Sequence, residues 1–215
     1  MMDTGRYVSL DENEVKRLIR DNPWGTLVTH TANGLIASHY PMLLEEDTDG
    51  ISLVSHVGKP DDDKLELGQG EALVIIQGPH GYISPGWYDK FSVPTWNHVT
   101  AHLYGVPEIL SDDENWRVLS TLVHHFEDRM PHPTLMEHDE DYSRKLMAGT
   151  AGFRLRVTRF EARLKLSQNR PTVAGRIIDE LDHGDNYSHP ELADEMRRVH
   201  PNVGVNTPRA QNGTA

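Results

Sequence analysis

Cysteine is absent from this chain of 215 residues, so disulfides, thiolate metal ligands and a cysteine nucleophile are excluded. No run of residues approaches the roughly 20 consecutive apolar positions that a membrane-spanning helix requires. The first 18 residues also lack the apolar centre of a secretory signal peptide. We therefore expect a cytoplasmic protein without a membrane partner.

The common motifs of nucleotide-binding loops and hydrolytic sites are missing as well. No GxxxxGK[ST] loop occurs, and GQGEAL at residues 68–73 lacks a third glycine and precedes a predicted strand. The motifs GxSxG and HExxH are absent, which gives no support to a serine hydrolase or a zinc site. A bound nucleotide must therefore be held by side chains.

Two of the thirteen histidines, His39 and His56, lie on predicted strands. A histidine on a strand is commonly half-buried and satisfied by hydrogen bonds. In a barrel it can also contact a cofactor or serve as an axial ligand. Both interpretations stay open at this point.

The formal net charge of −12 is unevenly distributed along the chain. Residues 151–176 carry a net charge of +6, which leaves −18 for the rest. A local cationic segment suits a small anionic ligand better than a nucleic-acid duplex, which needs a broad basic face. The alternative is that each cation pairs with an acidic neighbour. The cations are Arg154, Arg156, Arg159, Arg163, Lys165, Arg170 and Arg176.

Apolar periodicity predicts helices and antiparallel strands in an order that indicates an α+β fold. One helix follows the capping-box pair Ser9 and Glu12, and another follows Ser111 and Glu114. The order of helix, strands, helices and a late strand favours an antiparallel barrel with flanking helices. The strands are expected at residues 25–31, 34–44, 50–57, 71–78 and 98–110, with a strand pair or one bent strand at 152–168.

Residues 79–97 form a long segment with little periodicity, three prolines, two tryptophans and two tyrosines. Loops of this length without secondary structure of their own are usually functional or disordered. This one is too aromatic for disorder, so the sequence predicts a packed binding loop.

The segment LKLSQNR at residues 164–170 combines apolar and anion-binding side chains. If it is extended, Lys165, Ser167 and Asn169 share one face, while Gln168 lies with two leucines on the other. With Arg170 at the end, the polar face can bind a phosphate or carboxylate. The alternative is that residues 167–169 only form a turn.

The segment VPTWNH at residues 93–98 offers groups suited to a planar heteroaromatic ligand. Thr95 supplies a hydroxyl, Trp96 a large ring and Asn97 an amide. Together the two segments could hold the ring and the phosphate of flavin mononucleotide (FMN). The alternative is that Trp96 belongs to the core.

QGPHGYISPGWY, VPTWNH and LKLSQNRP, in this order and spacing, resemble the PaiB-type family of FMN-binding split barrels over about residues 7–181. The resemblance implies a split barrel, a homodimer with FMN near its interface, and a role as a negative transcriptional regulator or flavin-dependent redox protein. It implies a cofactor-binding domain at residues 1–181 and a helical extension and tail at 182–215. Carried over to this chain, the cofactor-binding residues would be His56, Lys59, Thr95, Trp96, Asn97, Lys165, Ser167, Gln168, Asn169 and Arg170.

The chain departs from the family pattern after Lys59 and Pro60, where Asp61, Asp62 and Asp63 follow. Three carboxylates would repel a nearby phosphate unless they point away from it.

A second interpretation is a haem enzyme, because haem-dependent piperazate synthases resemble PaiB proteins. Here His56, or less favourably His39, would be an axial ligand of haem b, and the reaction would join the two nitrogens of N5-hydroxyornithine. A third interpretation, direct DNA binding, lacks a recognition helix and is opposed by the net charge. The sequence leaves open whether the protein is an enzyme, and which small-molecule ligand it takes.

Overall fold

The computed structural model describes residues 8–46, 48–201 and 203, which divide into two compact units. Unit 1 consists of Leu10–Gln77 and Thr100–Ala162. Unit 2 consists of the described residues within Met2–Ser9, Gly78–Val99 and Arg163–Ala215. Three strands have residues in both units, namely β6 (Ala72–Ile83), β7 (Thr95–Gly105) and β10 (Arg159–Lys165).

The strands form a six-stranded sheet of order β1-β10-β7-β6-β2-β3 and a four-stranded sheet of order β4-β5-β9-β8. Neighbouring strands are antiparallel wherever the register is recorded, as in β2 with β3 and β5 with β9. Two open antiparallel sheets with flanking helices confirm the predicted α+β split barrel. The remaining strands are β1 (Val8–Ser9), β2 (Trp24–Thr31), β3 (Gly34–Pro41), β4 (Leu43–Leu44), β5 (Ser52–Gly58), β8 (Pro107–Ile109) and β9 (Thr150–Arg156).

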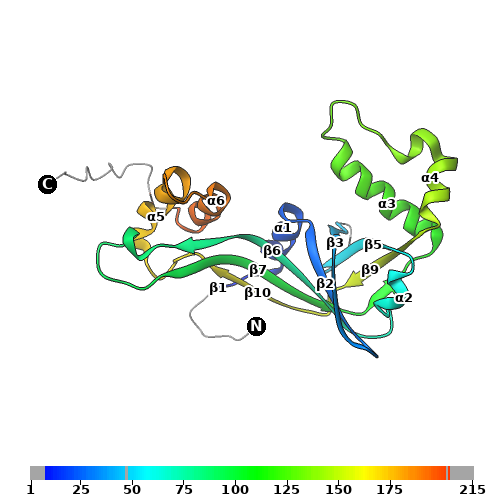
Figure 1. Cartoon of the computed structure of the whole chain (residues 1–215), viewed down its shortest axis with the longest axis horizontal. Coiled ribbons are helices and arrows are strands. Elements are labelled where there is room, and N and C mark those ends of the chain that lie inside the picture. Colours follow the sequence, from blue (N-terminus) through cyan, green and yellow to red (C-terminus); the bar gives the residue numbers. More distant parts are fainter. Residues whose placement is uncertain (1–7, 47, 202, 204–215) are drawn as a thin grey trace. The chain divides into compact units, whose positions relative to one another are not determined.

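The largest helix of unit 1, α3 (Asp112–Glu127), covers the sheet of β5 and β9 (Figure 1). Its N-cap Ser111 accepts a hydrogen bond from the Glu114 backbone N–H, which confirms this predicted capping box. Its Val118 and Leu122 belong to a buried cluster that also contains Leu43, Val54 and Leu110. The other helical elements of the unit are α1 (Glu12–Asp21), α2 (Asp61–Lys64), η2 (Met136–Asp139) and α4 (Glu140–Met147).

The N-cap of α1 is Asp11, so the predicted cap at Ser9 is wrong. The Asp11 carboxylate accepts from the Glu14 backbone N–H at 2.9 Å. Ser9 instead belongs to β1, where it pairs with Arg163 of β10. Both Ser9 and Asp11 have a glutamate three positions later. Strand pairing decides between them, because a residue held in a ladder cannot also begin the helix.

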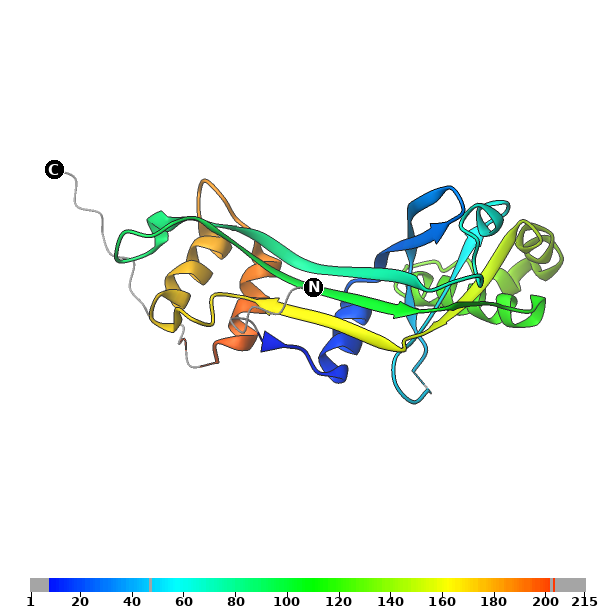
Figure 2. The same ribbon diagram turned by 90° about the horizontal axis from the view of Figure 1, so that it is seen from below.

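Unit 2 contains two helices, α5 (Pro171–His183) and α6 (Pro190–Val199), which pack against each other. They are the two neighbouring orange helices of Figure 2. The α6 side approaches β6 closely at Gly81, where a Cβ atom would lie 2.8 Å from the Tyr187 hydroxyl and 2.9 Å from Leu192. A boundary between residues 181 and 182 stays a prediction, although α5 and α6 share this unit. No helix in the described ranges has the length and apolarity to cross a membrane.

The segment 79–97 is strand at both of its ends, so the irregular loop is shorter than predicted. β6 extends to Ile83 and β7 starts at Thr95, which leaves residues 84–94 and the short helix η1 (Pro85–Trp87) between them. The alternation of burial in β6 shifts by one residue at Pro79 and His80, as an extra residue in a strand would produce. That shift conceals the strand from a search for two-residue periodicity.

An ion-pair cluster in unit 1 centres on Arg154 of β9, whose side chain is only 8% exposed. Its guanidinium donates to both Glu45 carboxylate oxygens, at 2.8 and 3.0 Å, and to Glu114 at 3.2 Å. Glu45 also accepts from Arg117 at 2.9 Å and from Ser52 at 2.9 Å. The Glu45 charge is therefore compensated by several donors, as a carboxylate removed from solvent requires.

Acid should remove the contribution of Glu45 to stability. Hydrogen bonds from Arg154 lower the Glu45 pKa from 4.5 to about 2, against the opposing effect of burial. Because the pKa is lower in the folded state, the contribution is complete above about pH 4.5 and is lost as the pH falls towards 2. Urea unfolding between pH 6 and 2.5 should show this loss, and Glu45→Gln should flatten it. A Glu45→Gln profile as steep as that of the natural protein would contradict the assignment, and Glu71→Gln, whose side chain is 50% exposed, is the control.

Candidate anion-binding site

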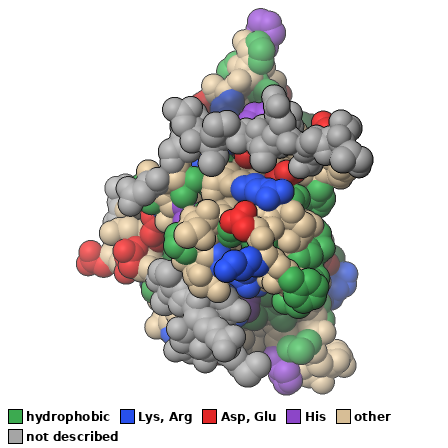
Figure 3. Space-filling model, turned by 90° about the vertical axis from the view of Figure 1, so that its left-hand side faces the viewer, with side chains coloured by type: hydrophobic (Ala, Val, Ile, Leu, Met, Phe, Trp, Pro, Cys, Tyr) green, Lys and Arg blue, Asp and Glu red, His purple; other side chains and the backbone are tan. Residues whose placement is uncertain are grey.

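A pocket of about 190 Å³ in unit 2 is lined by the 84–94 loop, the start of β7 and the end of β10 with the turn that follows it. We call it the anion pocket. The space-filling view from the α5 end shows cationic side chains on either side of an acidic one, with hydrophobic side chains nearby (Figure 3). Six of the ten predicted cofactor-binding residues meet in the pocket. The lining residues are Tyr88, Val93, Pro94, Thr95, Asn97, Lys165, Ser167, Asn169 and Arg170.

Lys165 is the first cation of the pocket and stands at the end of β10. Its ammonium donates to the Thr95 hydroxyl at 2.5 Å, which joins the two strand ends. Burial lowers the pKa of Lys165, and repulsion from Arg163 lowers it further. The pKa of His98 is lowered by burial and then by Lys165, Arg163 and His80. Positive charge is therefore concentrated around Lys165, and a bound anion would relieve that repulsion.

Arg170 is the second cation and lies at the start of α5. Its guanidinium carbon lies 4.7 Å from the centre of the Tyr88 ring, within the range of a cation–π contact. α5 begins at Pro171, directly after Arg170, and the positive end of its dipole therefore faces the same region as the cation. The electrostatics of the pocket thus favour a small anion such as a phosphate.

Residues 167–170 form a tight turn, so the alternative of a turn describes the end of LKLSQNR, and the segment is not extended throughout. β10 ends at Lys165, Ser167 has a φ of 61°, and the Arg170 backbone N–H donates to the Ser167 carbonyl at 2.8 Å. The Asn97 amide, which is fully buried, stabilises the turn by donating to the Ser167 hydroxyl at 3.0 Å. The turn still directs Ser167 and Asn169 to the same pocket as Lys165.

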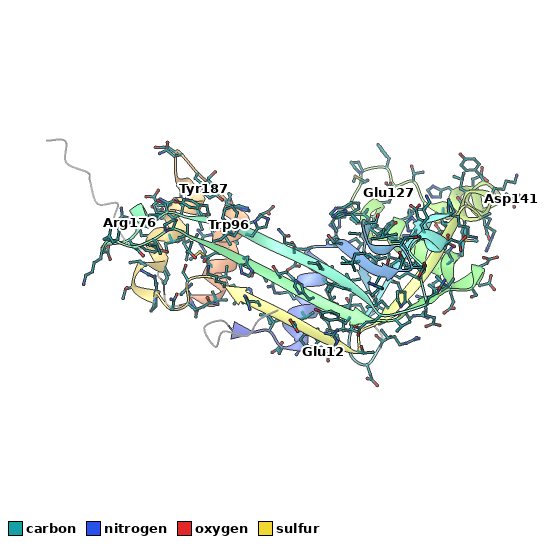
Figure 4. All side chains as sticks on the ribbon, turned by 60° about the horizontal axis from the view of Figure 1, so that its bottom comes forward. Glu12, Trp96, Glu127, Asp141, Arg176 and Tyr187 are labelled. Carbon is teal, nitrogen blue, oxygen red and sulfur yellow. The ribbon has the colours of Figure 1, made fainter. Side chains whose placement is uncertain are left out.

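Trp96 is not among the residues that line the pocket, although its neighbours Thr95 and Asn97 are. Successive side chains of a strand point to opposite faces, which explains the separation. The Trp96 indole donates to His80 Nδ1 at 3.2 Å and is 48% exposed, so the alternative of a core tryptophan is also wrong. Trp96 and Tyr187, labelled in Figure 4, both have edge contacts with Tyr82.

The Gln168 side chain forms hydrogen bonds with backbone groups and does not line the anion pocket. Its side-chain carbonyl accepts from the Leu166 N–H at 2.7 Å, and its amide donates to the Leu164 carbonyl at 3.0 Å. It lines a separate cavity of about 320 Å³ with His200 and other residues of the α6 end.

His56 and Lys59 belong to unit 1 and are not among the lining residues. Burial lowers the pKa of His56, and its Nδ1 has no hydrogen-bond partner among the described residues. Asp61, Asp62 and Asp63 form most of α2 in unit 1 and also do not line the pocket. These carboxylates were expected to repel a nearby phosphate, but they do not contribute to the wall of the pocket.

In the cationic segment at residues 151–176, some arginines pair with acidic side chains and another lines the pocket. Arg154, Arg156 and Arg159 pair with glutamates of unit 1, and Arg176 lies 3.8 Å from Asp89 in unit 2. Of the cations in the segment, Arg170 and Lys165 alone line the pocket.

Sequence reasoning missed Tyr88, Val93 and Pro94 as lining residues, although it did predict a binding role for the segment that contains them. The aromatic and proline content of the segment was the available signal. Which of its side chains face the cavity depends on how the 84–94 loop folds back over the turn of residues 167–170.

Fold and site together define an α+β split barrel with a cationic pocket. The chain belongs to the family described as "Putative FMN-binding domain", whose model matches residues 1–159. This confirms the resemblance to PaiB-type proteins, and FMN is the cofactor of the family.

Known relatives and structures agree with this membership. "Protease synthase and sporulation protein PAI 2" of Bacillus subtilis is 32% identical over 190 residues, which covers 85% of this chain and 90% of that protein. The FAD and haem binding protein of Mycobacterium smegmatis has a TM-score of 0.55 at 18% identity, covering 72% of this chain and 71% of that one. The flavocytochrome Anf3 of Azotobacter vinelandii has a TM-score of 0.57 at 13% identity, covering 76% and 72%. These two structures bear on the fold alone.

Proposed function

We propose that the anion pocket binds the phosphate of FMN and that the protein is a flavin-dependent redox protein of PaiB type. The observation that carries the proposal is the convergence of Lys165 and Arg170 with the hydroxyls of Thr95 and Ser167 in one pocket. Cations and hydroxyls are the donors that a phosphate needs, and hydrogen bonds between charged partners are stronger than neutral ones. The residues present therefore fit the phosphate end of the cofactor.

The size of the pocket limits which part of FMN it can hold. Pockets that bury a drug-sized ligand measure roughly 300–1,000 Å³, whereas this one measures about 190 Å³. The phosphate fits, while the three-ring system has to lie outside. Val93 at the pocket and Phe91 nearby are 67% and 100% exposed, so apolar surface is available beside it. We propose that a second copy of the chain covers the ring, giving a homodimer with FMN near the interface.

FMN supplies electron or hydride transfer when it is bound, and the chain supplies binding and orientation. Lys165 and Arg170 hold the charge of the phosphate, and Thr95 keeps the Lys165 ammonium in place. Asn97 is bonded to Ser167 and to Met196, so its amide orients the turn rather than the flavin ring. The assignments of Trp96, His56 and Lys59 to the cofactor stay predictions.

Regulation of transcription is the second output that the family suggests. The name of the Bacillus relative refers to sporulation, and a regulatory role of this chain would act through a protein partner. The net charge of −12 opposes direct contact with a DNA backbone.

The haem alternative is supported by one observation, the His56 imidazole. Burial lowers its pKa, which favours the neutral form, and its Nδ1 is buried without a partner among the described residues. A neutral imidazole nitrogen is what an axial iron ligand requires. In this alternative, His56 would hold haem b and the reaction would form an N–N bond in N5-hydroxyornithine.

Titration of the purified protein with FMN, riboflavin and haemin tests the proposal. We expect FMN to bind at least about 100-fold more tightly than riboflavin, because only FMN offers a phosphate to the two cations. Flavin fluorescence gives both dissociation constants, and light scattering of the same samples gives the oligomeric state. Equal affinities for the two flavins would refute the phosphate assignment. A Soret band that is lost in His56→Ala would instead support the haem enzyme.

A further inference from the structure

The turn that presents Ser167, Asn169 and Arg170 depends on the backbone of the residue before it, Leu166. Leu166 is fully buried at the point where β10 has ended. Buried backbone groups need hydrogen-bond partners, and here the strand no longer provides them. The Leu166 N–H donates to the Gln168 side chain at 2.7 Å, and the Leu166 carbonyl lies 2.9 Å from His200 Nε2.

The hydrogen bond of His200 comes from the end of α6, 34 residues further along the chain. A carbonyl oxygen only accepts, so His200 carries its proton on Nε2 and donates. The side chain is 7% exposed, and its backbone N–H donates to the Met196 carbonyl at 3.1 Å. The end of α6 therefore holds the imidazole in a defined place.

A second contact joins α6 to the same turn. The Met196 sulfur lies 3.4 Å from the Asn97 amide nitrogen, which donates to the Ser167 hydroxyl at 3.0 Å. Ser167 adopts a φ of 61°, a conformation that non-glycine residues keep only when their surroundings determine it. The hydrogen bonds that Gln168, Asn97 and His200 form hold the turn in this conformation.

We propose that Gln168 and His200 are positioning residues for phosphate binding. They pair both backbone groups of Leu166 and thereby fix the turn in the conformation that aims Ser167 and Arg170 at the anion. The residues that line the anion pocket include neither of them, so both act through the turn. This inference rests on the proposed binding of FMN phosphate, and it makes the C-terminal helix α6 a part of the cofactor site.

The test compares the affinities for FMN and riboflavin in substituted proteins. His200→Ala should weaken the binding of FMN about tenfold and that of riboflavin less than about twofold, because the misplaced turn affects only the contacts with the phosphate. His200→Gln can still donate from a side-chain nitrogen and should restore most of the affinity for FMN. Gln168→Ala should behave like His200→Ala, and it carries the test if His200→Ala does not fold.

Leu192→Ala is the matched control, because Leu192 is fully buried on α6 and lies beside Gly81 of β6. It should lower the melting temperature and leave the ratio of the two flavin affinities unchanged. The inference is overturned if Gln168→Ala and His200→Ala leave the ratio unchanged, or if Leu192→Ala reduces it equally. If Lys165→Ala and Arg170→Ala also leave the ratio unchanged, the proposed function itself has failed.

Discussion

Lys165→Ala and Arg170→Ala should each weaken the binding of FMN by about 30- to 100-fold and change that of riboflavin by less than about threefold. Each substitution removes one of the two cations that line the anion pocket. A hydrogen bond to a charged group contributes about 1.5–3 kcal/mol, and its loss leaves the phosphate charge partly uncompensated. The effect should exceed that of any neutral lining residue.

The two cations should respond differently to conservative exchange. Arg170→Lys keeps the charge but loses the planar contact with Tyr88 and the paired donors of the guanidinium, so part of the affinity should remain. Lys165→Met keeps most of the side-chain volume and should behave like Lys165→Ala. Fluorescence titration at two salt concentrations measures these effects, because screening should weaken FMN binding in the natural protein more than in the variants.

Arg176→Ala is the control for a general change in charge. Arg176 lies on α5, only six positions after Arg170, but its partner is Asp89 and it is not among the lining residues. We expect less than a threefold change in FMN affinity. If Arg176→Ala weakens FMN as much as Arg170→Ala, the effect is one of net charge, and the pocket assignment is wrong.

Arg154→Met should lower the free energy of unfolding by about 3 kcal/mol, the largest stability effect that we expect from one substitution. Arg154 is 8% exposed and Glu45 is 13% exposed, so the lost partner cannot be replaced freely by water. Glu45 would keep Arg117 and Ser52 as donors, which limits the loss. Urea unfolding followed by circular dichroism measures the change.

Arg156→Met is the matched control on the same strand. Arg156 lies two residues further along β9, is 65% exposed and pairs with Glu108. Exposed ion pairs contribute about 0.2–1 kcal/mol, so the loss should stay below 1 kcal/mol. Equal losses in the two variants would show that burial does not decide the role of Arg154.

In the double variant Arg154→Met with Glu45→Gln, part of the lost stability should return, because no buried charge is left without its main partner.

Local signals in the sequence determined much of the fold. The alternation of apolar residues and the hairpin turns predicted β2, β3 and β5, and Ser111 with Glu114 predicted the start of α3. These signals depend on neighbours within a few positions, so no tertiary contact is needed to read them. Ser9 shows their limit, because its pairing with Arg163 removed it from the helix it was predicted to cap.

The sequence also determined the chemistry of the candidate site, because cations, hydroxyls and amides that lie together favour the binding of an anion. Only the tertiary structure decided which of them meet. Lys165 reaches Thr95 across 70 positions of the chain, and His200 reaches Leu166 across 34. The left-handed conformation of Ser167 turns an expected strand into a pocket wall, while Trp96, between two lining residues, faces away. Such outcomes depend on strand ends and a helix end approaching one another, and residue spacing along the chain does not encode that approach.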